Sequence, residues 1–202
     1  MSVPKTFREQ GERAITSYNF SEFASGLGFI TFYFAVNMAD ATLGYFLTEN
    51  SSLYSENQGW ENNTPKIDVK TETDIDFDLS PFSRPVVMDG TAVANLFTHF
   101  NVGGGGPYYN YTITIIKWDG TTETEIATAT TGNRTVTSNT NNIATSVINI
   151  DVPLTKFKIG ESLRVNLTTS TAGDLFRLFV DPANRDANPD NSSISIPFRV
   201  DI

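Results

Sequence analysis

The stretch that decides the fold is YYNYTITIIKW, residues 108–118. In it Tyr111, Ile113 and Ile115 occupy every second position, and a threonine stands between each of them and the next. Strict alternation places one set of side chains on a buried face of a β-strand and the other set toward water. This stretch therefore predicts a half-buried strand.

A turn signal follows this strand directly. Asp119-Gly120 separates it from residues 123–130, a second run of strand-forming residues. Glycine accepts the positive φ that a short turn requires. The sequence therefore predicts a hairpin that pairs residues 108–118 with residues 123–130.

Similar strand signals recur on both sides of the hairpin, and no convincing amphipathic helix interrupts them. This pattern predicts an all-β fold, an antiparallel β-sandwich of the jelly-roll kind. The N-terminal residues 1–14 are expected to form a short arm, and residues 15–202 a single sandwich, with a subdivision near 103–107 as the alternative. The other expected strands are residues 15–20, 29–36, 42–48, 67–69, 75–79, 86–88, 92–100, 143–152, 157–169 (with a turn at Gly160), 175–180 and 193–202.

The composition excludes several classes of function. The chain carries 23 acidic against 14 basic residues, a net charge of −9, which predicts no direct binding of nucleic acid. It has no cysteine, so disulfides, zinc-thiolate sites and thiol nucleophiles are excluded. The most apolar run, residues 27–36, is too short to cross a bilayer as a helix, and no signal peptide is visible. We expect a soluble product made in the cytoplasm, without membrane contact.

The single histidine of the chain, His99, is the first candidate for catalysis. A serine-type triad would require it, yet the sequence has no Gly-x-Ser-x-Gly nucleophile elbow. A structural or surface histidine is the favoured interpretation, and no catalytic residue is assigned.

A row of carboxylates at Asp74, Asp76 and Asp78, preceded by Asp68, is the second candidate. Alternation places the three on one face of a strand. The favoured interpretation is a solvated face that discourages edge-to-edge pairing of strands. Hard oxygen ligands for Ca²⁺ and a carboxylate pair for glycoside hydrolysis stay open as alternatives. We assign no metal ligand and no cofactor site.

Two loops have ordinary structural interpretations. Asp181–Asp190 is rich in Asp and Asn, but it lacks the bend glycine and the distal glutamate of an EF-hand, so turns stabilised by side chains are favoured. Gly103–Gly106 is followed by neither the lysine nor the helix of a phosphate-binding loop. It is interpreted as a bent connection.

Aromatic side chains near the deciding strand admit two interpretations. Tyr108, Tyr109, Tyr111 and Trp118 would suit a platform for sugar stacking, but large aromatics also dominate the interiors of sandwiches. Packing in the core is the favoured interpretation.

Four segments resemble the jelly-roll or β-sandwich structural proteins of virus particles, those of tailed phages and related viruses. They are Met1–Arg13, Ile115–Thr122, Phe157–Val165 and Ile196–Ile202. The resemblance implies a non-enzymatic virion structural protein, such as a capsid, cement, decoration, tail or connector subunit. It also implies a homo-oligomer that contacts itself and other virion proteins.

Two other functions stay open. A carbohydrate-binding or adhesive β-sandwich would stack a glycan on Tyr54, Trp60 or Tyr108. A secreted hydrolase would depend on the carboxylate row at Asp74, Asp76 and Asp78.

Overall fold

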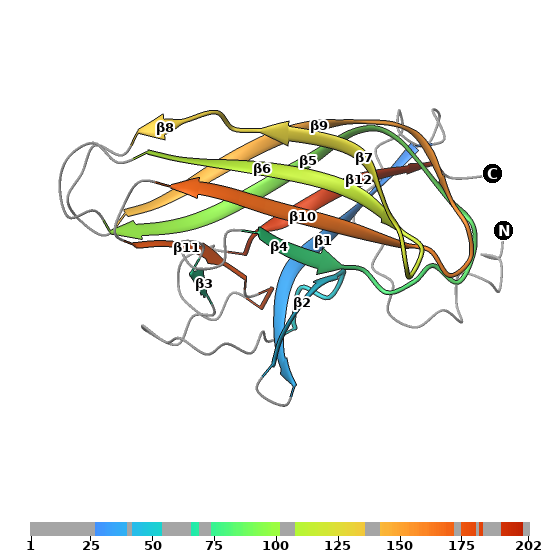
Figure 1. The fold of residues 1–202 in the computed structure, drawn as a ribbon, viewed down its shortest axis with the longest axis horizontal. Coiled ribbons are helices and arrows are strands. Elements are labelled where there is room, and N and C mark those ends of the chain that lie inside the picture. The colour runs from blue at the N-terminus through green and yellow to red at the C-terminus, as the bar shows by residue number, and fades with distance from the viewer. Residues whose placement is uncertain are drawn as a thin grey trace, which may run out of the picture.

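The described part of the chain is built from β-strands (Figure 1). The structure, a computed structural model, describes residues 27–39, 42–53, 66–68, 74–101, 108–135, 142–171, 175–180, 182–183 and 191–199. The strands are β1 (Leu27–Ala39), β2 (Thr42–Thr48), β3 (Lys66–Asp68), β4 (Asp74–Asp78), β5 (Val86–Asn101), β6 (Tyr108–Trp118), β7 (Glu123–Thr130), β8 (Arg134–Thr135), β9 (Asn142–Phe157), β10 (Ser162–Thr171), β11 (Leu175–Phe179) and β12 (Ser193–Arg199).

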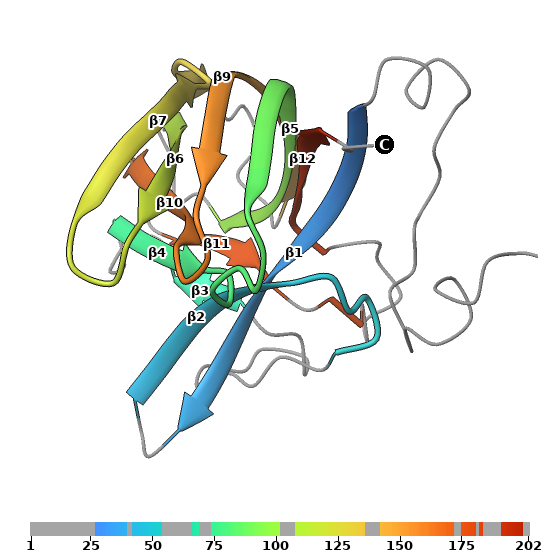
Figure 2. The ribbon, with the colours of Figure 1, turned by 90° about the vertical axis from the view of Figure 1, so that its right-hand side faces the viewer.

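These strands form one continuous hydrogen-bonded sheet that folds over on itself. Its order is β3-β11-β5-β12-β1-β2-β4-β10-β6-β7, and β8 pairs with β6 while β9 pairs with β5. Figure 2 shows β6, β7 and β10 in one layer and β5, β9 and β12 in the other. The prediction of an all-β sandwich is therefore confirmed.

The long strand β1 connects the two layers. Its residues Leu27–Tyr33 pair with β12, and its residues Tyr33–Ala39 pair with β2. The strand β2 then meets β4 through a single parallel pair, Phe46 with Asp78, whereas the other pairings are antiparallel. A central strand has both edges occupied and is covered on both faces, which suits the apolar character of residues 29–36 in β1.

The core lies between the layers and follows the alternation of the strands. On β6, Tyr111, Ile113 and Ile115 are fully buried, as the deciding stretch predicts. Aromatic rings also join separate strands. The ring centres of Phe34 in β1 and Phe77 in β4 lie 4.7 Å apart, and their planes meet at 72°, an edge-to-face arrangement. Such ring pairs stabilise the fold by more than the burial of their apolar area alone.

The strand β5 differs from the prediction. Residues 86–88 and 92–100 were expected to form two strands, but they belong to one strand with an irregularity. Between Met88 and Gly90 the pairing with β9 shifts its register, and Gly90 has a φ of 124°. A bulge with glycine at positive φ keeps the strand continuous while bending it.

Several predictions lie outside the described residues. They include the N-terminal arm, the strand at residues 15–20 and the aromatics Tyr54 and Trp60, and the domain limits stay a prediction. Strands on both sides of residues 103–107 do lie in the same sheet. In the part of the chain that the structure covers, no helix has the length and apolarity to span a bilayer.

Candidate functional site

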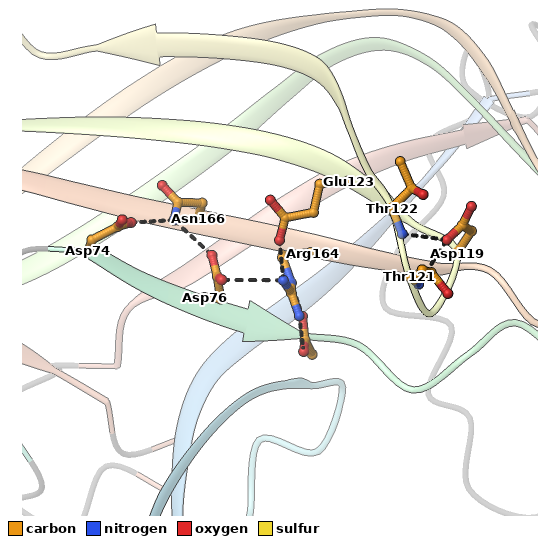
Figure 3. A network of polar contacts seen from close by, with 9 residues as sticks. Asp74, Asp76, Asp119, Thr121, Thr122, Glu123, Arg164 and Asn166 are labelled. Carbon is orange, nitrogen blue, oxygen red and sulfur yellow. Dashed lines mark hydrogen bonds and ion pairs between the residues drawn. The ribbon is translucent and has the colours of Figure 1, made fainter.

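A network of charged and amide side chains lies on the outer face of β4, β10 and β7. We call it the Arg164 network, and Figure 3 shows its arrangement. Its members are Asp74, Asp76, Asp78, Glu123, Arg164 and Asn166.

Strand register brings the members together. Along the β4–β10 ladder Arg164 is opposite Asp78, Asn166 is opposite Asp76 and Thr168 is opposite Asp74. Side chains two residues apart point to the same face of a strand, so the three aspartates and their partners share one surface. The prediction that the aspartates share a face is confirmed.

Arg164 is the centre of the network. Its Nε and Nη2 donate to the two carboxylate oxygens of Asp78 at 2.6 and 2.8 Å, and its Nη1 donates to Glu123 of β7. The same Nη1 lies 3.3 Å from Asp76 Oδ2. Its guanidinium carbon also lies 4.6 Å from the centre of the Trp118 ring. The hydrogen bond to Asp78, opposed in part by burial, raises the pKa of Arg164 above its ordinary value, so the network always contains this cation.

Asn166 joins the other two aspartates. Its Nδ2 donates to Asp74 Oδ1 at 2.6 Å and to Asp76 Oδ1 at 2.7 Å, and its Oδ1 accepts from Thr168 at 3.1 Å. One amide group therefore donates a hydrogen bond to each of two neighbouring carboxylates. It acts as a neutral counterpart of the Arg164 guanidinium beside it.

The network can join strands, and its chemistry suits that role better than catalysis. The side chain of Arg164 is 13% exposed, and its nitrogen atoms bind carboxylates. The side chains of Asp76, Asp78 and Glu123 are 40–48% exposed. The guanidinium of Arg164 already neutralises Asp76 and Asp78, which argues against the alternative that these carboxylates bind Ca²⁺. In the described ranges no three His, Cys, Asp or Glu residues are grouped to hold a metal ion.

The favoured role of the aspartate row also needs correction. A face that protects a free edge was expected, but β4 lies inside the sheet, between β2 and β10. The carboxylates do not repel a neighbouring strand here; they pair with its Arg164 and Asn166.

The β6–β7 hairpin carries a smaller polar site. Asp119 Oδ1 accepts from the main-chain N–H of Thr121 at 2.9 Å and of Thr122 at 2.6 Å (Figure 3). These two bonds lower the pKa of Asp119 below its ordinary value. Gly120 has a φ of 94°, as the predicted turn requires.

The structure places the other sequence candidates as follows. Tyr109 and Tyr111 are 5% and 0% exposed, so packing in the core is confirmed for them. The backbone of His99 pairs with Ile143 on one side and Arg177 on the other, while its side chain lies outside the described residues. Most of Asp181–Asp190 lies outside them as well.

Sequence reasoning missed Arg164, Asn166, Glu123 and the role of Trp118. A signal exists in hindsight, because Arg164, Asn166 and Thr168 alternate with the same period as the aspartates. Only the pairing of β4 with β10 makes these two rows neighbours.

No protein-family model matches the sequence, and no curated protein matches it either. Solved structures do match the fold. A CocE/NonD family hydrolase from Staphylococcus aureus is 13% identical, with a TM-score of 0.57, over 86% of this chain and 36% of that chain. An aminopeptidase from the marine sediment archaeon Thaumarchaeota archaeon is 11% identical, with a TM-score of 0.51, over 87% of this chain and 37% of that chain. The chain thus spans little more than a third of the length of these two structures.

These matches correct two expectations. The sequence was expected to encode a virion structural protein with no enzymatic role, and both expectations are wrong, because the better-matched folds belong to hydrolases. A chain of the T13 IBDV viral particle is 13% identical over 86% of this chain, but its TM-score of 0.30 is too low to support a virion location. This chain shares its all-β architecture with β-sandwich proteins in general.

Proposed function

We propose that this chain is the β-sandwich unit of a hydrolase and works beside a catalytic domain. One observation carries the proposal: the matched hydrolase and aminopeptidase share the fold over 86–87% of this chain, which is only 36–37% of their own length.

The described side chains fit a supporting role within such an enzyme. The interior is a packed apolar core, and the Arg164 network uses its donors to join β4, β10 and β7. A rigid sandwich of this kind is a suitable surface for a second domain, because it holds its shape when one face is covered. The proposal therefore assigns packing to this unit and bond cleavage to the rest of the hydrolase.

The test compares the native protein with the isolated chain. Antibodies against the recombinant 202-residue chain would purify the native protein from its source, and its mass and its hydrolysis of alanine p-nitroanilide and p-nitrophenyl acetate would be measured. We expect a mass above the 22.2 kDa of this chain and activity that co-purifies with it. The recombinant chain alone is the control, and we expect no activity from it.

Two results would contradict the proposal. A native protein that hydrolyses neither substrate would remove the hydrolase assignment. Equal activity in the isolated chain would place bond cleavage within these residues, and His99→Gln would then be the first variant to measure.

A further inference from the structure

Four hydroxyl side chains lie inside the core at one end of the sandwich. We call them the internal hydroxyl cluster: Thr98 of β5, Tyr111 of β6, Ser146 of β9 and Thr169 of β10. The first three are 0% exposed and Thr169 is 5% exposed. Because two members come from each layer, the cluster lies between the layers.

Strand register and a side-chain approach between the layers place the four hydroxyls close together. Tyr111 is directly opposite Thr169 on the β6–β10 ladder. On the β5–β9 ladder Thr98 is opposite Ala144 and Leu96 is opposite Ser146, so Thr98 and Ser146 are diagonal neighbours on the inner face. The Thr98 side chain also lies close enough to the Tyr111 hydroxyl to oppose the rise that burial causes in the pKa of Tyr111, so the two side chains meet between the layers.

The hydroxyl of Ser146 distinguishes this cluster from an ordinary polar contact. Thr98 Oγ1 donates to the carbonyl oxygen of Ala144 at 3.2 Å, but Ser146 Oγ has no hydrogen-bond partner in the protein. A buried hydroxyl without a partner costs free energy, and proteins commonly satisfy such groups with an internal water. A buried water needs about two to four polar partners, which this cluster can supply.

We propose that the internal hydroxyl cluster binds one structural water molecule, held by Ser146 Oγ and Thr98 Oγ1. The chemistry favours water over an ion, because the residues beside Ser146 on the inner face, Ala144 and Ile148, are uncharged and apolar. A buried ion would need a compensating charge. The water supplies a donor and an acceptor to neutral hydroxyls and joins β5 to β9, the strands that carry Thr98 and Ser146, at this end of the core.

Oxygen-17 magnetic relaxation dispersion tests the proposal, because it counts waters held far longer than those on the surface. We expect Ser146→Ala to lose one long-lived water relative to the unchanged chain, with a melting temperature that is unchanged or lower. Thr98→Val, close in shape to threonine, should lose the same water. Ile148→Val is the matched control in the same strand and should keep it.

An unchanged water count in a folded Ser146→Ala chain would overturn the proposal. A higher melting temperature in that variant would also overturn it, since removal of a bare, unsatisfied hydroxyl stabilises a core. If Ser146→Ala does not fold, the water count of Thr98→Val decides instead, and an unchanged count there would overturn the proposal.

Discussion

Arg164 of β10 and Asp78 of β4 form a two-point ion pair, with Nε to Oδ1 at 2.6 Å and Nη2 to Oδ2 at 2.8 Å. Such fork-to-fork geometry combines charge with two directed hydrogen bonds, which a lysine cannot reproduce. The pair joins residues 86 positions apart in the sequence. It therefore contributes to the pairing of β4 with β10 and, through Glu123, to the attachment of β7.

Replacing Arg164 is the first test of this role. We expect Arg164→Lys and Arg164→Leu to lower the free energy of unfolding by about 1–3 kcal/mol, since hydrogen bonds to charged groups are lost and Arg164 is mostly buried. Urea denaturation followed by Trp fluorescence measures the change. The matched control is Lys117→Met, because Lys117 Nζ lies 3.8 Å from Glu161 Oε2, a weaker ion pair. Loss of this pair should lower the free energy of unfolding by less than about 1 kcal/mol. Equal losses in both positions would refute the special role of Arg164.

Gly90 provides a test of the bulge in β5. Its φ of 124° is rarely adopted by residues with a side chain, while a Cβ there would meet Pro197 at an ordinary 3.5 Å. Strain of the backbone, and not collision, therefore predicts that Gly90→Ala lowers stability by about 1–3 kcal/mol. Thermal denaturation gives the measurement. Gly44→Ala is the control, since Gly44 lies in a strand without positive φ, and a loss as large there would disprove the explanation.

The turn at Asp119 should depend on pH. The folded state lowers the pKa of this carboxyl, so its contribution is present above the unfolded value of 3.8 and is lost as pH falls through the lower, folded value. We expect the amide proton shifts of Thr121 and Thr122 to report this loss in an NMR titration. In Asp119→Asn the amide oxygen still accepts both bonds and does not titrate, so the two shifts should stay constant. A titration of the same size in that variant would exclude Asp119 as the cause.

The ring pair of Phe34 and Phe77 tests the packing between β1 and β4. Both side chains are fully buried, so Phe77→Ala should lower the free energy of unfolding by about 3–5 kcal/mol through the cavity it leaves. Guanidinium denaturation measures this loss. Ile159→Ala is the control, because Ile159 is 68% exposed and surface changes usually stay within about 0.5 kcal/mol. A small loss at Phe77 would show that the core is not tightly packed there.

Much of the strand content could be predicted from the sequence, because alternation is a local property. The expected strands at residues 42–48, 108–118 and 123–130 have the observed bounds. The division of β5 was wrong because Gly90 resembles a turn in the sequence, while in the sheet its neighbours β9 and β12 hold both sides of the strand together. The candidate site was predicted only in its β4 half.

The sequence by itself determined the all-β class, the buried face of β6 and the Asp119-Gly120 hairpin. The physical reason is that each depends on residues close together in the chain, whose periodicity and turn chemistry act locally. Only the tertiary structure decided that β4 lies beside β10, that Arg164 and Asn166 meet the aspartates, and that Ser146 lies in the core together with three other hydroxyl residues. These contacts depend on which strands pair across long stretches of chain, and side-chain alternation does not specify the partner of a strand.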